Sequence, residues 1–384
     1  MRICHIITRL IIGGAQENTI LSCEGLHARG HDVTLISGST CGPEGALTDR
    51  ARRGGYRFIE CPPLRRNVHP WHDLTALFDL QKLLRDIRPE VVHTHSSKAG
   101  ILGRIAARRT GAPLIVHTIH GMSFNRTQRA PTRAAYRALE RYCGAFTHRL
   151  VSVCDAMTDQ AVAARLAPRE RFTTVYSGME VDTFDPKLYD RNAVRAAWGA
   201  AANDVVVGAV ARLFRNKGYE DLIPAMGRAA QRDRRLQFVW IGDGHQRDEY
   251  VDRVRRLGLG DRLTLTGLVP PQEIPLLLTG IDLLAHASRW EGLPRAVVQA
   301  LLMEKPAVSF NIDGAPEVVL DGVTGRLAPL GDVEAFAAAI TDLTADADRR
   351  LAMGREGRRR CLERFDHRTM VANLEALYQQ PSRF

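Results

Sequence analysis

The sequence predicts an α/β protein made of two doubly wound parallel-sheet domains followed by a helical tail. Short β-branched runs alternate with helical stretches from the first residues onward, which is typical of a parallel sheet. This alternation breaks around residues 177–186 and then restarts. The chain has 384 residues, which is enough for two domains that each bury a core.

Eleven runs are predicted to be strands, and the break divides them into two groups. The first group is 3–8, 32–37, 57–61, 91–95, 114–118 and 150–153, and the second is 205–210, 237–241, 262–266, 282–285 and 307–310. Residues 333–380 keep a helical apolar spacing with no strand between them. We therefore expect domains at residues 1–184 and 185–365, with a helical tail at 366–384 that crosses back to the first domain.

Composition excludes several classes of protein. The chain is 45% hydrophobic and 25% charged, which is ordinary for a globular domain and unlike a disordered chain. Its longest apolar runs, such as 205–210, fall short of the roughly 18–20 residues that a membrane-spanning helix needs. The seven cysteines are odd in number and none forms a Cys-x-x-Cys pair, so a disulfide framework and a zinc site are disfavoured. The first residues indicate a strand and not a signal peptide, and we expect a cytoplasmic protein with at most peripheral membrane contact.

The positive charge is concentrated in the first half of the chain. Residues 1–180 hold 25 Lys and Arg against 15 Asp and Glu, which accounts for the whole net charge of +10. Five arginines recur there at steps of three and four, as on one helix face: Arg126, Arg129, Arg133, Arg137 and Arg141. A solvated helix face is one explanation. The charge asymmetry favours an anionic partner, which could be an acidic membrane surface, an acidic acceptor or a nucleic acid.

Candidate ligand groups in the first domain follow its predicted strands. Gly13 and Gly14 stand between the first strand and a helix, where N–H groups of the helix start can bind an anion, although a tight structural turn explains them equally well. His120 follows the strand at 114–118, and His93 and His95 end the strand before it. A histidine there can bond a sugar hydroxyl or simply pack, and a metal-binding cluster is the minor interpretation.

Candidate groups in the second domain also lie after strands. Arg212 and Lys217 lie in one strand-to-helix loop, where two cations can bracket a diphosphate. Gly242 and Gly244 form a glycine-rich turn, which is a weak signal. Glu291 precedes a turn and Pro294, which suits the first position of a helix. Its carboxylate can accept hydrogen bonds from sugar hydroxyls, while a helix-start acid is the alternative.

Taken in order, these segments resemble the retaining nucleotide-sugar glycosyltransferases of the GT-B fold, family 4, also called glycosyl transferases group 1. The similar segments are Gly13-Gly14, 117–121, 176–182, Arg212 with Lys217-Gly218, 242–244, 288–299, 314–317 and 321–325. The resemblance implies two Rossmann-like domains facing a central cleft, with the nucleotide sugar held mainly by the second domain and the acceptor by the first. It also implies transfer without a metal or other cofactor.

The resemblance implies a role for each matching residue. Arg212 and Lys217 match the diphosphate-binding pair, and Glu291 matches the first acid of a Glu-x7-Glu motif that holds sugar hydroxyls. His120 matches a histidine near the donor sugar and the reaction centre. The remaining donor-side positions are Gly13, Gly14, Gly242, Gly244, Gly292, Leu293, Arg295 and Gln299. His95 and the five arginines would lie on the acceptor or membrane side.

Two residues depart from the family pattern. Gln299 replaces the second acid of the motif, expected at the nucleotide ribose, so charge-assisted strength is lost there. Pro294 stands where many members have glycine, and proline has no N–H to donate.

The sequence predicts a glycosyltransferase that moves a sugar from a UDP- or GDP-sugar to a lipid-linked or polysaccharide acceptor in surface-glycan synthesis, as in lipopolysaccharide. Its location would be peripheral, on the inner face of the membrane. The alternatives are a sugar-nucleotide epimerase of the same fold and, at lower weight, a basic nucleic-acid-binding protein, for which no base-reading module is apparent.

Overall fold

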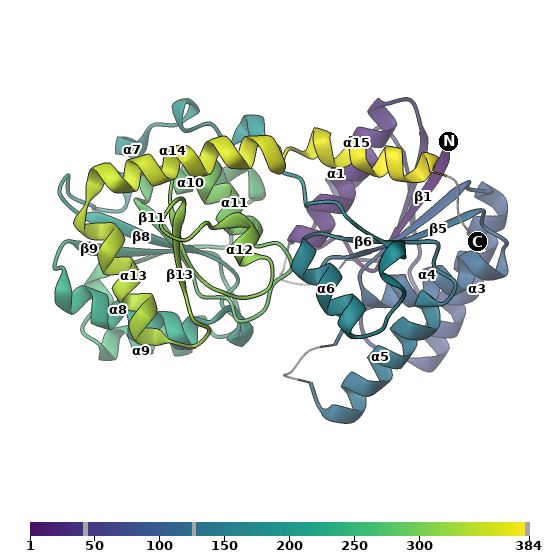
Figure 1. Ribbon diagram of the computed structural model, residues 1–384, viewed down its shortest axis with the longest axis horizontal. Helices are drawn as coiled ribbons and strands as arrows, with labels where there is room; N and C mark the ends of the chain where they lie inside the picture. The colour runs from purple at the N-terminus through teal and green to yellow at the C-terminus, as the bar shows by residue number, and fades with distance from the viewer. Residues whose placement is uncertain (41–44, 125–127, 381–384) are drawn as a thin grey trace. The chain divides into compact units, whose positions relative to one another are not determined.

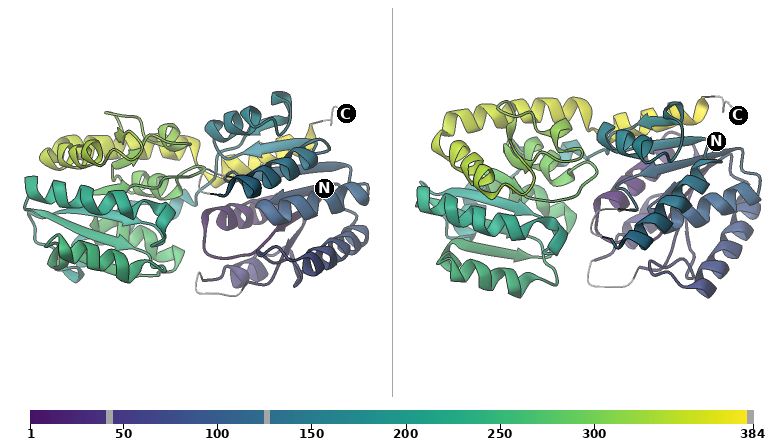
Figure 2. Two further views of the ribbon diagram at one scale, coloured as in Figure 1. Left: turned by 90° about the horizontal axis from the view of Figure 1, so that it is seen from below. Right: turned by 60° about the horizontal axis from the view of Figure 1, so that its bottom comes forward.

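A computed structural model describes residues 1–40, 45–124 and 128–380. The chain divides into two compact units, Met1–Gly178 with His367–Phe384, and Met179–Asp366. Each unit is a parallel sheet with helices on both faces (Figures 1 and 2). This confirms the predicted α/β class with two doubly wound sheets and C-terminal helices.

The first unit contains a seven-stranded sheet in the order β3-β2-β1-β4-β5-β6-β7. Its strands are β1 (Arg2–Ile7), β2 (Asp32–Ser37), β3 (Arg57–Glu60), β4 (Val91–His95), β5 (Leu114–Ile119), β6 (Arg149–Ser152) and β7 (Phe172–Thr174). Its helices are α1 (Gly14–Ala28), α2 (Thr48–Arg53), α3 (Pro70–Ile87), α4 (Ser97–Arg109), α5 (Ala130–Gly144), α6 (Asp155–Ala163) and α15 (His367–Gln379).

Helix α15, the last described helix, is part of the first unit and lies against α1 (Figure 1). Apolar residues of α15, among them Val371 and Leu374, join the core cluster that includes Ile20 and Leu26 of α1. The two helices come so close that a Cβ on Gly25 would lie 2.5 Å from Val371 Cγ2. A larger residue at position 25 would force the helices apart, and this close contact ties the end of the chain to its beginning.

The second unit contains a six-stranded sheet in the order β10-β9-β8-β11-β12-β13. Its strands are β8 (Val205–Val210), β9 (Leu236–Ile241), β10 (Leu263–Gly267), β11 (Leu283–His286), β12 (Ala307–Phe310) and β13 (Gly325–Ala328). Its helices are α7 (Arg191–Ala197), α8 (Tyr219–Arg232), α9 (Arg247–Arg256), α10 (Ile274–Gly280), α11 (Arg295–Leu302), α12 (Ala315–Val318), α13 (Val333–Ala345) and α14 (Ala347–Arg364).

Local chemistry explains where several of these helices begin. The Asp332 and Asp346 carboxylates accept hydrogen bonds from the N–H groups of Ala335 and Arg349, so they cap α13 and α14. Pro294 is the N-cap of α11 and not its first helical residue, which corrects the sequence expectation by one position. Proline suits both places because neither requires its missing N–H.

The division between the units falls after Gly178, six residues before the boundary expected from the sequence pattern. The chain passes from one unit to the other twice, after Gly178 and again after Asp366. The Met179 N–H donates to the Phe365 carbonyl at 2.7 Å, and Met179 forms a parallel bridge with Asp366. Residues 179–184 therefore belong with the second unit, since their backbone is tied to the end of α14.

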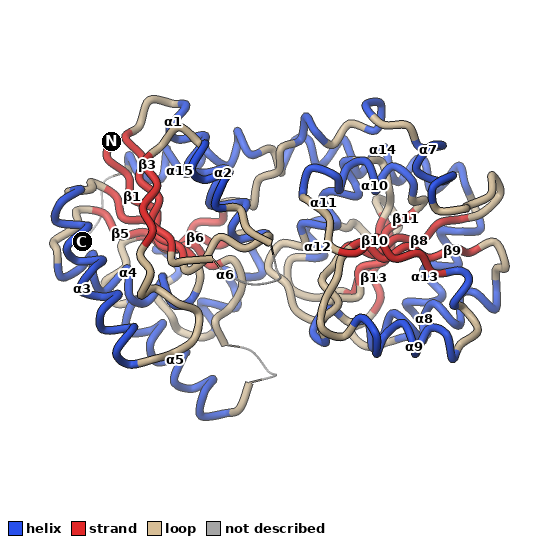
Figure 3. Tube along the Cα trace, turned by 180° about the vertical axis from the view of Figure 1, so that it is seen from behind, coloured by secondary structure: helices blue, strands red, loops and turns tan. Residues whose placement is uncertain are grey.

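The strand orders define where a ligand is expected in each unit. In both sheets the order reverses direction beside the first strand, between β1 and β4 in the first unit and between β8 and β11 in the second. Figure 3 shows the strands of each unit in red, with blue helices around them. Loops leaving the carboxyl ends of such neighbouring strands diverge to opposite faces of the sheet, and ligands bind where they part. Among the described residues, no helix combines the length and the apolar character needed to cross a membrane.

Candidate functional site

The loops after β8 and β11 bring Lys217 and Glu291 together at the switch point of the second sheet. The Lys217 ammonium donates to Glu291 Oε1 at 2.7 Å, and both side chains are largely buried. These two residues are 74 positions apart in the sequence. The predicted cation and the predicted sugar-binding carboxylate therefore form one ion pair.

Neighbouring groups keep the Glu291 carboxylate ionised. Burial by itself would raise the pKa of this carboxyl, but Lys217 and His286 Nε2, 3.4 Å from Oε1, outweigh it and hold the pKa well below its ordinary value. The Glu291 N–H donates to Asp313 Oδ2 at 2.8 Å, so the backbone is fixed as well. His286 ends the buried strand β11, and Asp313 follows the buried strand β12. Their position at strand ends is the sequence signal that could have identified both residues.

The Arg212 guanidinium lies over the Phe214 ring, 4.9 Å from its centre, and Phe214 stacks on His245. Arg212 and Lys217 are thus in the same loop, between β8 and α8, as the sequence indicated. Stacking on the ring restricts the long arginine side chain.

Gly242 and Gly244 have a structural role in the turn after β9. A Cβ on Gly242 would lie 2.3 Å from the Ala211 carbonyl oxygen, and one on Gly244 would lie 2.4 Å from that of Leu213. Gly242 also has a φ of 138°, which side chains rarely adopt. These glycines let the turn pack on the 211–213 loop, so they position the loop that carries Arg212.

The segment after β11 is held by an ion pair that the sequence did not reveal. Arg289 forms two hydrogen bonds with Asp221 of α8, at 2.6 and 2.7 Å. The Gly292 carbonyl accepts a hydrogen bond from the Gly314 N–H. Leu293 is buried, whereas Arg295 and Gln299 lie partly exposed on the first turns of α11. The loop that carries Glu291 is therefore fixed to α8 on one side and to the segment after β12 on the other.

In the first unit, Gly13 is the N-cap of α1 and Gly14 is its first residue. The Gly13 carbonyl accepts from the N–H groups of Gln16 and Glu17, as in an ordinary helix start. This places both glycines at the carboxyl end of β1, beside the switch point of the first sheet.

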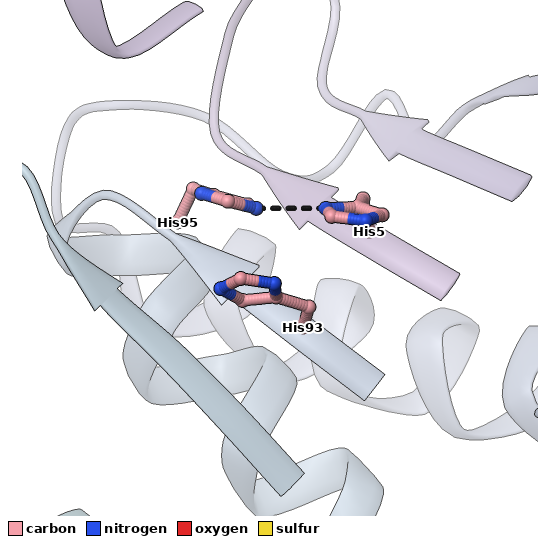
Figure 4. A group of neighbouring side chains, drawn as sticks. All are labelled: His5, His93 and His95. Carbon is pink, nitrogen blue, oxygen red and sulfur yellow. Dashed lines mark hydrogen bonds between the residues drawn. The ribbon is translucent and has the colours of Figure 1, made fainter. Parts of the chain in front are cut away.

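His95 and His120 lie in a cluster of histidines at that same switch point. His5 Nδ1 is 2.9 Å from His95 Nε2, and His95 Nδ1 is 3.0 Å from His120 Nε2. Figure 4 shows His5 and His95 joined by the first of these bonds, with His93 beside them. Burial lowers the pKa values of His5, to about 3, and of His93 and His95, well below the ordinary value. The sequence indicated His93 and His95 but not His5, which is buried within β1.

Three of these histidines are also close enough to be considered as metal ligands. One nitrogen each from His5, His93 and His95 lie within 4.8 Å of one another. Imidazole is a common ligand of zinc, copper and nickel. Each ring, however, already has a protein hydrogen-bond partner: His93 Nδ1 is 2.5 Å from the Tyr378 hydroxyl, and its Nε2 is 2.7 Å from the Thr118 hydroxyl. Both nitrogens of His93 are thus hydrogen-bonded within the protein.

The predicted basic face is carried by α5. Arg133, Arg137 and Arg141 are exposed on this helix, Arg129 precedes it, and Arg126 lies outside the described residues. Arg137 donates to the Ala164 carbonyl at 3.1 Å. A buried ion pair of 2.5 Å between Arg104 and Glu140 fixes α5 to α4.

Helix α3 carries an exposed apolar stripe that the sequence did not predict. Trp71, Leu74 and Phe78 are 75%, 46% and 58% exposed, and their spacing of three and four residues places them on one helix face. The helical spacing of these residues was the available signal, but core-facing apolar residues give the same pattern.

Two family models match the chain, one over each of its two parts. Residues 190–360 match the family model described as "Glycosyl transferases group 1". Residues 13–178 match the model described as "Glycosyl transferase 4-like domain". The two matches correspond closely to the two structural units.

Curated relatives match over nearly the whole chain. The UDP-Gal:alpha-D-GlcNAc-diphosphoundecaprenol alpha-1,3-galactosyltransferase of Escherichia coli is 30% identical over 349 residues, which are 90% of this chain and 88% of that protein. A GDP-mannose-dependent alpha-(1-6)-phosphatidylinositol monomannoside mannosyltransferase of Mycolicibacterium smegmatis is 28% identical, with 95% and 94% covered.

Solved structures agree on the fold. HepE of Anabaena, in complex with UDP and glucose, superposes with a TM-score of 0.85 at 22% identity and covers 99% of this chain and all of that one. WaaG, a glycosyltransferase involved in lipopolysaccharide biosynthesis, gives a TM-score of 0.75 at 14% identity, with 99% and 100% covered.

Proposed function

This chain belongs to the glycosyl transferases group 1, the retaining glycosyltransferases of family 4 with the GT-B fold, and on that premise we propose its donor, acceptor and site residues. The donor is a nucleoside-diphosphate sugar, with UDP as the nucleotide. The acceptor is a lipid-linked sugar used in surface-glycan synthesis. The 30% identical relative from E. coli, whose name specifies UDP-Gal and a diphosphoundecaprenol-linked acceptor, supports both assignments.

The observation that carries this proposal is the Lys217–Glu291 ion pair at the switch point of the second sheet. An ammonium group has three N–H donors, and the bond to Glu291 uses one of them. Lys217 can therefore bind a phosphate oxygen while it stays paired with Glu291. The carboxylate, kept ionised by its neighbours, then accepts hydrogen bonds from sugar hydroxyls beside the diphosphate.

In the proposed reaction, Lys217 and Arg212 bind the departing diphosphate and offset the negative charge that develops on it. The bond between the sugar C1 and the phosphate oxygen breaks, and a bond from C1 to the acceptor oxygen forms on the same face. The leaving phosphate oxygen takes the acceptor proton, so no protein base is required. Two fixed cations supply the charge that a divalent metal would otherwise provide.

The acceptor side is assigned to the first unit. His120, in the same unit, binds a hydroxyl of the donor sugar near the reaction centre. The exposed arginines of α5 attract an anionic membrane surface. The apolar stripe of α3 supports this assignment, because exposed aromatic residues on a helix can enter the lipid headgroup region. The protein would then act as a peripheral protein on the inner face of the membrane.

The first experiment is calorimetric titration with UDP and with GDP in the presence of a chelator, repeated on Arg212→Ala. Binding of UDP in chelator, weakened by Arg212→Ala, is the expected result. Preference for GDP would overturn the assignment of the nucleotide, and binding only with added metal would overturn the role given to the two cations.

The second experiment is product analysis with UDP-hexoses and a GlcNAc-diphosphopolyprenol acceptor. Transfer that is lost in Glu291→Ala supports the proposal. A donor that is epimerised in the absence of acceptor would favour the epimerase alternative instead.

A further inference from the structure

His286, the last residue of β11, faces the carboxylate of Glu291. The imidazole is buried, and its Nε2 lies 3.4 Å from Glu291 Oε1. The contact falls just short of an ordinary hydrogen bond, and within the described parts of the chain Nε2 has no other hydrogen-bond partner. A shift of a few tenths of an ångström would turn this contact into a hydrogen bond.

The charge of Glu291 decides which nitrogen of His286 carries the proton. Glu291 is ionised, since it pairs with the Lys217 ammonium at 2.7 Å. A bare lone pair on Nε2 would be repelled by the charge on Oε1, whereas an N–H at Nε2 is attracted to it. A neutral His286 therefore carries its proton on Nε2, and a protonated His286 carries one there as well. In both forms the ring presents a donor to Glu291.

Lys217 and His286 contact the same oxygen of the Glu291 carboxylate. Both lie near Oε1, at 2.7 and 3.4 Å, and in the chain as described no hydrogen bond or ion pair reaches Oε2. Two donors on one oxygen restrict the rotation of the carboxylate plane, and they leave the lone pairs of Oε2 for a ligand. Oε2 is therefore the atom suited to accept a hydrogen bond from a sugar hydroxyl.

The two donors differ in how firmly they are held. The Lys217 ammonium is carried by a flexible four-carbon chain, and in the reaction proposed above it also binds the diphosphate. The His286 ring, in contrast, is packed at the end of a buried strand. The Glu291 backbone is held separately, by the hydrogen bond from its N–H to Asp313. His286 can therefore hold the Glu291 side chain when Lys217 shares its charge with a phosphate.

We infer that His286 is a positioning residue for recognition of the donor sugar. Its Nε2–H bonds to Glu291 Oε1 as Lys217 engages the diphosphate, so that Oε2 stays directed at a sugar hydroxyl. The sugar and the diphosphate rest on the function proposed above, whereas the contact between His286 and Glu291 does not depend on it. Loss of His286 should thus weaken recognition of the sugar more than recognition of the nucleotide.

The first test locates the proton of His286 in the protein without substrate. It uses two-bond proton–nitrogen NMR spectra of the wild-type protein labelled with ¹⁵N-histidine at pH 8, with the His286 signals assigned through their loss in His286→Gln. We expect a proton on Nε2. A wild-type His286 that carries its proton on Nδ1 alone would overturn the inference, because the ring would then have no donor to offer to Glu291.

The second test separates recognition of the sugar from that of the nucleotide, in transfer assays with a UDP-hexose. In His286→Leu, kcat/KM for the donor should fall about tenfold, as for the loss of one hydrogen bond to a charged group, while the inhibition constant of UDP changes less than about twofold. In His286→Gln, the amide N–H can replace Nε2–H, and most of kcat/KM should return.

Leu284→Val is the matched control on the same strand. Leu284 is buried two residues before His286 and therefore on the same face of β11. This change disturbs the packing of the strand without touching Glu291, and it should leave both constants unchanged.

Equal changes of kcat/KM and of the UDP inhibition constant in His286→Leu would indicate a general loss of structure and would overturn the inference. An unchanged kcat/KM in this variant would overturn it too. If His286→Leu does not fold, His286→Asn takes its place, since its shorter amide cannot reach Oε1 and the same loss is expected. If the wild-type protein binds no UDP and transfers no sugar, the proposed function fails, while the NMR result on His286 and Glu291 still stands by itself.

Discussion

At the switch point of the first sheet the polar groups are neutral imidazoles, whereas at that of the second sheet they are ionised side chains. His5, His93, His95 and His117 are buried with lowered pKa values, and their bonds are to each other and to hydroxyls. Lys217 and Glu291 instead form an ion pair. The same strand arrangement thus supports two kinds of chemistry, one suited to uncharged hydroxyls and one suited to a diphosphate.

Acid should destabilise the first unit before it destabilises the second, and this difference in stability is the largest effect that we expect. The four buried histidines bind protons in the unfolded chain near pH 6.5 but resist them when folded, so the first unit loses stability as the pH falls below 6.5. Each can remove up to about 1.4 kcal/mol per pH unit. Glu291 has a lowered folded pKa, so its contribution persists until the pH falls below its ordinary value near 4.5.

Urea unfolding at pH 7, 6 and 5, followed by peptide-resolved hydrogen exchange, measures this difference. Peptides from β4 should lose protection well before peptides from β8, which act as the internal reference. Equal loss of hydrogen-exchange protection in both sheets would contradict a difference in acid sensitivity between the two polar centres.

Removing the cation of the second centre should affect catalysis strongly. Lys217→Ala is expected to lower kcat/KM on the order of 10²–10³-fold, the usual effect of losing one group that stabilises developing charge. Arg215→Ala is the matched control. Arg215 lies in the same loop, is 77% exposed, and is 3.8 Å from Glu249. Steady-state kinetics with the donor sugar should show less than a twofold change for Arg215→Ala, and equal losses in both variants would refute a specific role for Lys217.

Charge reversal on α5 should weaken membrane binding by the first unit. Arg133→Glu combined with Arg141→Glu is expected to reduce binding to vesicles with acidic lipid by at least about tenfold, since each basic residue near such a surface contributes about 1 kcal/mol. Reversal of the exposed Arg255 and Arg256 on α9 of the second unit serves as control. Co-sedimentation with acidic and with neutral vesicles distinguishes the outcomes, and retention on neutral vesicles alone would exclude electrostatic attraction.

A smaller effect is expected at Gln299 of the second unit, where a substitution should strengthen binding instead of weakening it. Gln299→Glu should tighten nucleotide binding several-fold, because a carboxylate accepts ribose hydroxyls more strongly than an amide does. Calorimetry with UDP measures the change, and Gln237→Glu on β9 offers a comparison outside the site. Weaker binding in Gln299→Glu would place this side chain away from the ribose.

The sequence predicted strands best where apolar runs are uninterrupted. The bounds of β2, β4, β8 and β12 agree with the expected ranges, since these strands are buried on both faces. The strands β7 and β13 were missed. Both are short edge strands, and Gly325 and Arg326 in β13 weaken the β-branched signal.

The candidate site was predictable only in part. Family resemblance singled out Lys217 and Glu291, but no spacing rule brings together residues 74 positions apart. His5 was missed because an isolated histidine in an apolar strand looks like a core residue. Only the register of β1 against β4, which pairs His5 with His93, reveals that it belongs to a polar cluster.

The packing of α15 against α1 has a consequence for biosynthesis. The second unit is continuous in the chain, from Met179 to Asp366, so all of its strands leave the ribosome together. The first unit needs α15, whose Tyr378 hydroxyl contacts His93. Its seven strands are therefore translated first, yet its core closes only after the whole second unit has been made. Until then the side of α1 that packs on α15 is uncovered, and the nascent chain is most at risk of aggregation during that interval.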